Sequence, residues 1–183
     1  GSCCLGRGDT TMPQVHQSSF IAASAVIIGD VTIGKNCGIF PHAVIRGDEN
    51  SIMIGDGSNI QDCCVIHTDA KHTVQIGKNV TIGHAAVIHG ACIEDECLIG
   101  IHATVLNGAH ICSGSIIGAC ALVTEGMIVP TDSLVLGVPG KIMKQNPQFI
   151  DSIRENATIY QKLSQNHKQG RYEIYGLDDE KNL

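Results

Sequence analysis

A six-residue period in the aliphatic residues constrains the fold of this chain more than any other feature. A glycine often follows the aliphatic residue, as at Gly34 and Gly83, and a small residue often sits four positions after it, as at Cys37 and Ala86. An amphipathic helix would repeat every 3.6 residues, so the period excludes a helix here. Such repetition is typical of solenoids. The aliphatic positions are Ile33, Ile39, Ile45, Ile54, Ile60, Ile66, Ile76, Ile82, Ile88, Ile93, Ile99, Val105, Ile111, Ile117 and Val123.

The repeat predicts an all-β solenoid of short strands. Each hexapeptide forms one flat side, its aliphatic residue points inward, and the small residue allows a tight corner. Three sides close a triangular coil of about 18 residues, and successive coils stack about 4.8 Å apart. We expect the solenoid over residues 18–145, after an N-terminal segment of residues 1–17 whose Gly-Ser start is consistent with a tag remnant.

Two interruptions of the period mark one corner of the solenoid. RGDENSIM separates Ile45 from Ile54, which makes nine positions instead of six, and HTDAKHTVQ separates Ile66 from Ile76, which makes ten. Both follow the third side of a coil, so both additions leave the same corner. Loops on a rigid scaffold are where functional residues tend to lie.

The period ends after LVLGVPGKIMK, and a helical pattern follows. We expect a C-terminal helix over residues 146–170, with Pro147 near its start, and a polar tail over 171–183. The expected apolar face comprises Ile150, Ile153, Ala157, Tyr160 and Leu163. This face predicts that the helix packs back along the solenoid.

The composition argues against several classes of function. The chain has 183 residues and a net charge of −6, so it lacks the basic footprint that nucleic acid or an anionic membrane surface would require. No apolar run approaches the length of a membrane span. The first residues lack the apolar core of a secretory signal, so we expect a cytoplasmic protein.

The nine cysteines are expected to be structural. Six of them belong to the repeat, and most of these six occupy positions that suit a small apolar residue. They are Cys37, Cys64, Cys92, Cys97, Cys112 and Cys120. Buried free thiols in a reducing compartment are the interpretation. No Cys-x-x-Cys pair occurs, which argues against a zinc–thiolate site. The role of Cys63 and Cys64, close in sequence to candidate site residues, stays open.

Three histidines occupy distinctive positions in the repeat. His67 and His89 each follow the aliphatic residue on the third side of consecutive coils, so they should stack about 4.8 Å apart. His84 lies on the second side, and the extended chain from it to His89 is about 16 Å long. Metal–nitrogen bonds are about 2.0–2.1 Å, so His84 cannot share a metal with the other two histidines within one chain.

A neighbouring subunit could complete the set. In a three-fold homotrimer, His84 of one chain could face His67 and His89 of the next, and closed symmetry would make three equal sites. Three imidazoles and a water are typical of catalytic zinc. The alternative is that these are ordinary surface histidines, since the chain has nine.

Polar residues around these histidines favour the metal interpretation. Asp62 shares the register position of His84, and Arg46 shares that of His67 and His89. Acidic and amide groups beside imidazoles are what orients metal ligands and positions water. The further members of this polar set are Asp48, Glu49, Asn59 and Gln61.

Four segments together resemble the γ-class carbonic anhydrases, which are hexapeptide-repeat proteins with a left-handed parallel β-helix. They are RGDEN at 46–50, NIQD at 59–62, the histidine at 67 and IGHAAVIHG at 82–90. The resemblance implies reversible hydration of CO2 to bicarbonate by a metal-bound hydroxide at trimer interfaces. It implies zinc, or iron or cobalt, bound by His67, His89 and a His84 donated by the adjacent subunit.

The resemblance also implies roles for the neighbouring residues. Arg46 and Asp62 match an intersubunit salt bridge, and Gln61 matches the residue that hydrogen-bonds the metal-bound water. Glu49 matches an acidic residue near the substrate, and Tyr160 is the candidate for a helix tyrosine near the site. Asn59 and Asp48 match supporting groups beside these residues.

One departure from the family pattern concerns proton transfer. Members with a longer loop after the first metal histidine carry a shuttle glutamate there, whereas this loop is only TDAKHT. Asp69 or His72 could replace it, or the loop has no shuttle, which predicts slower catalysis. Two alternatives stay open: an acyl-CoA-dependent acyltransferase or thioesterase on the same fold, and a non-enzymatic trimeric structural subunit.

Overall fold

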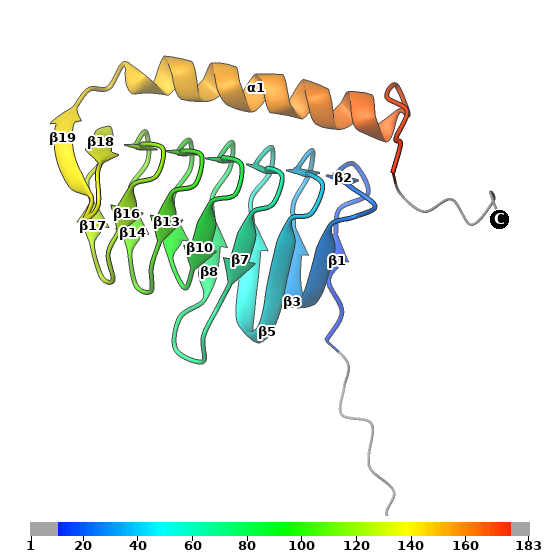
Figure 1. Cartoon of the computed structure of the whole chain (residues 1–183), viewed down its shortest axis with the longest axis horizontal. Helices are drawn as coiled ribbons and strands as arrows, with labels where there is room; N and C mark the ends of the chain where they lie inside the picture. The colour runs from blue at the N-terminus through cyan, green and yellow to red at the C-terminus, as the bar shows by residue number, and fades with distance from the viewer. Residues whose placement is uncertain (1–10, 177–183) are drawn as a thin grey trace, which may run out of the picture.

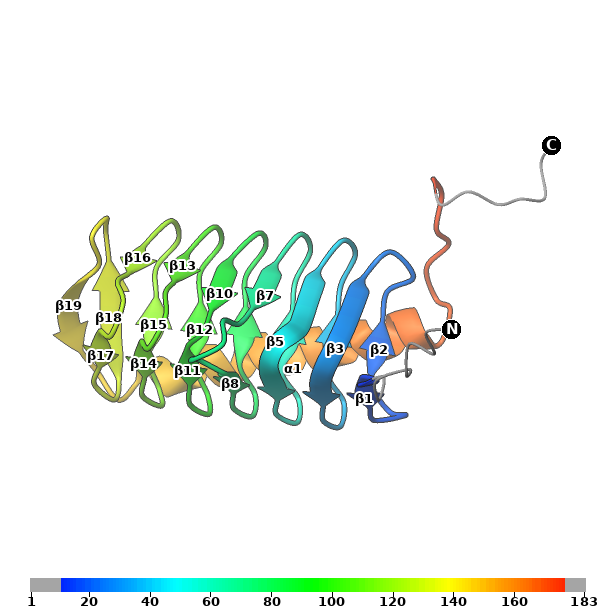
Figure 2. The ribbon, with the colours of Figure 1, turned by 90° about the horizontal axis from the view of Figure 1, so that it is seen from below.

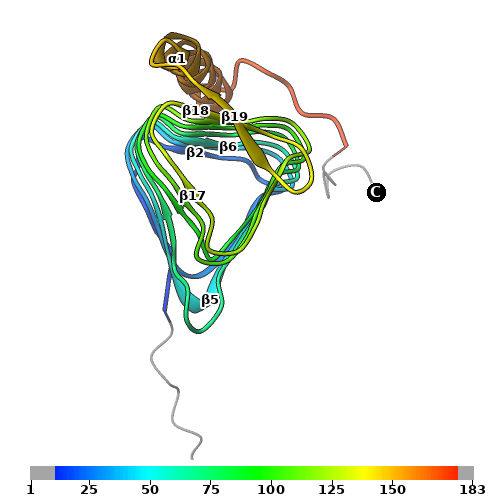
Figure 3. The same ribbon diagram turned by 90° about the vertical axis from the view of Figure 1, so that its left-hand side faces the viewer.

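A parallel β-solenoid with a single helix along it forms the described part of the chain. The structure is a computed structural model that describes residues 11–176. The coils follow one another in sequence order along the long axis (Figures 1 and 2). Seen end on, they enclose a triangular section (Figure 3). The expected all-β solenoid of hexapeptide repeats with a C-terminal helix is therefore confirmed. Within residues 11–176, no helix combines the length and apolarity that a bilayer crossing would need.

The three sides of the coil form three faces, which we name by what they carry. The histidine face contains the first parts of β3 (Val26–Ile33) and β5 (Val44–Ile54), followed by β7 (Val65–His67), β10 (Val87–His89), β13 (Thr104–Val105) and β16 (Leu122–Val123). The second face contains β1 (Gln14–Val15), the later parts of β3 and β5, then β8 (Val74–Ile76), β11 (Cys92–Ile93), β14 (His110–Ile111) and β17 (Ile128–Val129).

The helix-covered face is a separate sheet of short strands beneath α1 (Phe149–Lys168). The helix contacts β2, β4, β6 and β9 and buries Ile153 and Ala157, two of the residues expected on its apolar face. A final strand, β19, runs antiparallel to β18. The strands of this face are β2 (Phe20–Ile21), β4 (Gly38–Ile39), β6 (Asn59–Ile60), β9 (Thr81–Ile82), β12 (Leu98–Ile99), β15 (Ile116–Ile117), β18 (Ser133–Leu136) and β19 (Lys141–Gln145).

The strand register reproduces the repeat. Cys92 pairs with His110, 18 residues later. Across the interruptions Val44 pairs with Val65, an offset of 21, and Val65 with Val87, an offset of 22. The additional residues therefore leave the coil at a corner, and the aliphatic residues of the repeat still point inward. Figure 3 shows both excursions at the same corner.

The interior is a set of stacked aliphatic side chains. Ile45, Ile66 and Ile88 are all fully buried and occupy equivalent positions in consecutive coils. At many corners a residue with positive φ precedes the small buried residue, as Ala85 (φ 57°) precedes Ala86. That conformation turns the chain sharply, and the small side chain fits inside the corner.

The structure changes several expected details. The first solenoid pairing joins β1 to β3, so the coil begins at Gln14 rather than at residue 18. RGDEN is not a detached loop, because β5 continues through it, and Gly47 and Ile52 pair with Gly29 and Val31 of β3. The helix lies within the expected range of 146–170. Residues 1–10 and 177–183, with the expected tag remnant and the end of the tail, lie outside the described residues.

The cysteines divide by register. Cys37, Cys64 and Cys97 are buried as expected, in the small-residue position of a corner. Cys92 and Cys112 are only half-buried, because they flank inward-pointing isoleucines and so face outward. Cys120 is exposed at a corner, where its φ is 60°. The expectation of burial is therefore wrong for these three.

Candidate metal site

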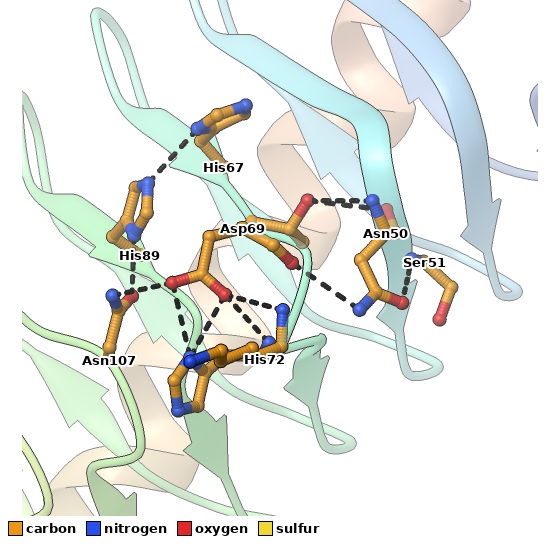
Figure 4. A network of polar contacts seen from close by, with 9 residues as sticks. Asn50, Ser51, His67, Asp69, His72, His89 and Asn107 are labelled. Carbon is orange, nitrogen blue, oxygen red and sulfur yellow. Dashed lines mark hydrogen bonds and ion pairs between the residues drawn. The ribbon is translucent and has the colours of Figure 1, made fainter.

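Two of the candidate histidines lie side by side on the histidine face. His67 of β7 and His89 of β10 are register partners in adjacent parallel strands. A hydrogen bond of 3.0 Å joins His67 Nδ1 to His89 Nε2, and the ring centroids are 5.0 Å apart (Figure 4). Both residues are half-buried. The repeat therefore brings two imidazoles from different coils to one place.

Asn107 fixes the orientation of His89. Its side-chain amide donates to Asp69 Oδ2 over 2.8 Å, so its carbonyl oxygen faces His89 Nδ1 at 2.6 Å. Since an amide oxygen only accepts hydrogen bonds, His89 donates from Nδ1. Its Nε2 lone pair is then presented toward His67. A neutral imidazole held in this way is the form in which histidine binds metals.

A carboxylate at the corner extends this arrangement. Asp69 accepts hydrogen bonds from the backbone N–H of Lys71 and of His72, each 2.8 Å long, and from His72 Nδ1 at 2.9 Å. These donors, the Lys71 N–H foremost, lower the pKa of Asp69 to about 2. Asn50 Nδ2 donates to the Asp69 carbonyl over 3.3 Å, which ties the two corner excursions together (Figure 4).

On the other side of His67, the hydrogen-bonded series continues into the RGDEN segment. His67 Nε2 lies 3.0 Å from Asp48 Oδ1, and Arg46 Nη1 donates to Asp48 Oδ2 over 2.7 Å. The hydrogen bond from Arg46 holds the pKa of Asp48 below its usual range. We call the whole series the surface polar chain: Arg46, Asp48, His67, His89, Asn107, Asp69 and His72.

His84 lies at a different edge, beside the helix. Its Nδ1 is 2.8 Å from Asp62 Oδ2, and the carboxylate can only accept, so His84 donates from Nδ1. Its Nε2 lies 3.3 Å from the Tyr160 hydroxyl of α1. His84 and His89 are thus held alike, each through Nδ1, with Nε2 left to bind.

A second hydrogen-bonded series lies under α1. The backbone N–H of His84 donates to Gln61 Oε1 over 3.1 Å, and Gln61 Nε2 donates to Asn59 Oδ1 over 3.1 Å. Asn59 Nδ2 donates to Thr81 Oγ1 over 3.0 Å. We call this series the buried polar chain: Asn156, Thr81, Asn59, Gln61 and His84, in which Asn59, Gln61 and Thr81 are buried. A cavity of about 330 Å³ beside it is lined by Gln61, His84, Asn156 and Tyr160 among others.

The candidate residues therefore form two groups within one chain. His67, His89, Arg46 and Asp48 belong to the histidine face, whereas His84, Gln61, Asp62, Asn59 and Tyr160 lie near α1. Glu49 is exposed in β5 beside Asp48. Arg46 pairs with Asp48 and Asp62 with His84 inside the chain, so the expected Arg46–Asp62 bridge between subunits stays a prediction. Within residues 11–176, the ligand atoms of Glu94, His110 and Cys112 converge, whereas those of the three histidines do not.

The donor set fits a metal of the zinc class. His84 and His89 each present Nε2 while an oxygen acceptor holds Nδ1, which is the arrangement that ligand histidines require. Two of the three imidazoles are adjacent in one chain, and the third, that of His84, lies at another edge of it. The sequence interpretation missed Asn107, although its position could be found by adding one coil of 18 residues to His89.

Comparison with known proteins decides the family. No family model matches the chain. A probable carbonic anhydrase from Methanocaldococcus jannaschii is 57% identical over 146 residues, which cover 79% of this chain and 92% of that protein. Gamma carbonic anhydrase 1, mitochondrial, from Arabidopsis thaliana is 38% identical over 85% of this chain, which spans 59% of its length. The chain belongs to the γ-class carbonic anhydrase family.

Solved structures place this family member among hexapeptide-repeat proteins. A hexapeptide transferase family protein from Anaplasma phagocytophilum is 37% identical, with a TM-score of 0.82 over 86% of this chain and 93% of that chain. A putative acetyltransferase from Bacillus cereus is 33% identical, with a TM-score of 0.84 over 87% of this chain and 93% of that chain. The fold is therefore shared with proteins of both names.

Proposed function

We propose that this γ-class carbonic anhydrase family member catalyses the reversible hydration of CO2 to bicarbonate. The reaction would take place at metal sites shared between the subunits of a homotrimer, with His67 and His89 from one chain and His84 from the next. Membership of the family supports the activity. The buried free thiols Cys37, Cys64 and Cys97 suit a reducing compartment such as the cytosol.

One observation carries this proposal: His84 and His89 are held in the same way although they lie on different edges. In each, an oxygen accepts a hydrogen bond from Nδ1–H, and Nε2 carries the lone pair. A single chain can bring only His67 to His89. A second chain that presents its His84 would complete a set of three imidazoles, which leaves an open position for water.

A zinc ion, or iron or cobalt, would supply a Lewis acid there, which lowers the pKa of a bound water to about 7. Gln61 would orient the attacking water, since its hydrogen bonds to His84 and Asn59 fix the side chain and leave one N–H free. Glu49, exposed at the corner, would carry protons or exchanging bicarbonate to solvent. Tyr160 would hold His84 Nε2 until the subunits meet.

Asn107 would act as a positioning residue in the same site. Its oxygen selects the His89 tautomer with the proton on Nδ1, and Asp69 selects the orientation of the Asn107 amide. Losing such an outer partner of a ligand histidine typically costs 10- to 100-fold in metal affinity. Arg46 would exchange Asp48 for Asp62 Oδ1 across the subunit interface, while Asp62 Oδ2 keeps its hydrogen bond from His84.

Subunit mixing tests whether the site is shared. His84→Ala and His89→Ala trimers should each lose metal and CO2 hydration when measured alone. If equal amounts are unfolded and reassembled together, three quarters of the trimers contain both chains, and each of these holds one intact site of three. Activity and metal content should therefore return to about a quarter of the wild-type values.

Controls separate a shared site from general damage. His102→Asn changes an exposed corner histidine with φ 57° and should leave metal content and activity unchanged. Stopped-flow hydration and elemental analysis on the same samples give the two readings. Full metal content in His89→Ala, or no recovery in mixed trimers that demonstrably contain both chains, would contradict the proposal.

An acyltransferase activity remains the second candidate, because a putative acetyltransferase of known structure is 33% identical over most of both chains. Such an enzyme would use one histidine as a base and need no metal. Consumption of acetyl-CoA by metal-stripped protein, with no loss on His67→Ala, would favour this activity over hydration. Hydration that depends on all three histidines would exclude it as the main activity.

A further inference from the structure

A second group of possible metal ligands lies on the second face, away from the three histidines. In β11 and β14, Cys92 pairs with His110 and Ile93 with Ile111. Both isoleucines are buried, so the residues on either side of them point outward. The result is a two-by-two block of outward side chains: Cys92, Glu94, His110 and Cys112.

Three of the four are close enough to share an ion. One ligand atom each from Glu94, His110 and Cys112 lie within 4.8 Å of one another. Ligands around a tetrahedral zinc lie about 3.3–3.8 Å apart, because zinc–ligand bonds are about 2.0–2.3 Å. The cluster therefore needs only a small contraction. His110 Nε2 now donates to Glu94 Oε1 over 2.7 Å, a bond that an ion would replace.

The Glu94 carboxylate is held in place by the next residue on the neighbouring coil. Ser113 donates from its backbone N–H at 3.0 Å and from its hydroxyl at 3.1 Å, both to Glu94 Oε2. These bonds, the backbone one first, lower the pKa of Glu94. The other carboxylate oxygen remains directed at His110. The Glu94 carboxylate is therefore held in one orientation by hydrogen bonds from Ser113 and His110.

A cavity of about 400 Å³ borders the block, and its lining includes Cys92, Glu94 and Ser113. A divalent cation bound to the block would deprotonate a coordinated thiol and so make it a thiolate ligand.

A disulfide is a poorer explanation of the two thiols. Cys92 and Cys112 are diagonal in the block, since Cys92 pairs with His110. The strand spacing and two residues of strand rise place their Cα atoms about 8 Å apart. Disulfides require about 4.4–6.8 Å, so the bond could not form without moving the backbone.

We propose that the second face binds one zinc-class transition metal through Glu94, His110 and Cys112, with Cys92 or water as the fourth ligand. The ion would link two adjacent coils and so act as a structural site. The missing Cys-x-x-Cys pair does not argue against it, because in a solenoid the ligands come from successive coils 18 residues apart. Thiolate and imidazole ligands together favour zinc, cobalt or copper over magnesium or calcium.

Cobalt(II) substitution distinguishes this site from the histidine site, since only a thiolate ligand gives an intense sulfur-to-cobalt charge-transfer band in the near ultraviolet. Wild-type protein, reduced with a phosphine and loaded with cobalt(II), should show this band. The double variant Cys92→Ser/Cys112→Ser removes both thiols of the block, so it should abolish the band and remove one equivalent of metal per chain. His110→Gln should weaken cobalt binding at least tenfold. Far-ultraviolet circular dichroism checks that each variant is folded.

Matched variants make the outcome decisive. Cys63→Ser and Cys120→Ser replace exposed thiols elsewhere and should leave the band intact. His89→Ala removes a histidine of the other site and should also leave it intact, so failure of the proposed function does not affect this test. Absence of the band in wild type, its survival in Cys92→Ser/Cys112→Ser, or its loss in Cys63→Ser or Cys120→Ser would overturn the proposal.

Discussion

The residues that hold the histidines in place lie in opposite environments in the buried and the surface polar chain. In the buried chain, Asn59 and Gln61 are only 1% and 3% exposed and lie between α1 and the sheet. In the surface chain, the Asp48 and Asp69 side chains are 41% and 32% exposed. Buried hydrogen bonds are expensive to leave unmade, whereas water can replace those at the surface. The first chain should therefore govern stability, and the second chain should govern ligand geometry.

This difference also bears on assembly. Gln61 is buried and accepts a hydrogen bond from the His84 backbone N–H, which holds this part of the site before any neighbour arrives. His67 and His89 are instead bonded to each other, and an ion must separate them. Under the proposed function, one chain brings a rigid half of the site and the next brings an adjustable half.

The largest loss of stability should come from the aliphatic interior, which is packed alike behind the buried and the surface polar chain. Ile60 lies behind the buried chain and Ile88 behind the surface chain, and both are fully buried. Ile60→Ala and Ile88→Ala should each lower the free energy of unfolding by about 2–5 kcal/mol, measured by urea denaturation. A loss at one position far smaller than at the other would show that the coils are not equally packed.

A smaller loss should follow from breaking the buried chain. Asn59→Leu keeps the approximate volume but leaves Gln61 Nε2 without its acceptor and Thr81 Oγ1 without its donor. The free energy of unfolding should fall by about 1–3 kcal/mol, again in urea. Asn107→Leu is the matched change in the surface chain and should cost less than about 1 kcal/mol, because water replaces the lost bonds. Equal losses would remove the contrast between the two chains.

For metal affinity, the change in the surface chain should matter more than the change in the buried chain. Asn107→Leu releases His89 Nδ1 and should weaken metal binding 10- to 100-fold in a competition with a chromophoric chelator. Asn107→Gln, which retains the amide, is the variant to test for partial recovery. Unchanged affinity in Asn107→Leu would show that Asn107 does not position His89.

The subtlest expected difference is in the reactivity of two adjacent thiols, Cys63 and Cys64, which lie between Gln61 and His67 in the sequence. Cys63 is exposed at the corner, whereas Cys64 is fully buried and burial raises its pKa to about 12. At pH 8 a thiol reagent should label Cys63 in the native protein and leave Cys64 unlabelled until unfolding. Mass spectrometry of the peptide separates the two positions. Rapid labelling of Cys64 would show that this corner opens.

Much of the fold follows from the sequence because the period is local and strict. The inward isoleucines and the stacking of His67 on His89 need only the offset between coils. The course of RGDEN was not predictable, since pairing of Gly29 with Gly47 keeps β5 extended through the corner. Nor did the period reveal that β1 begins the solenoid.

The candidate site was less accessible to sequence reasoning. Asn107 and Asn156 act through side-chain directions that the period does not specify. Cys92 and Cys112 face outward because side chains alternate around the inward-pointing Ile93 and Ile111. By sequence alone they count as small apolar residues, which predicts their burial. The proposed pairing of Arg46 with Asp62 of another subunit depends on a surface that one chain does not contain.

The antiparallel strand β19 has a consequence for solubility. A solenoid is open at its ends, and an unpaired parallel edge can accept the same edge of another molecule. β19 occupies the edge of β18 and reverses the chain direction there. A further coil therefore cannot continue that sheet in parallel. In this way, five residues at the end of the repeat oppose the growth of end-to-end fibres.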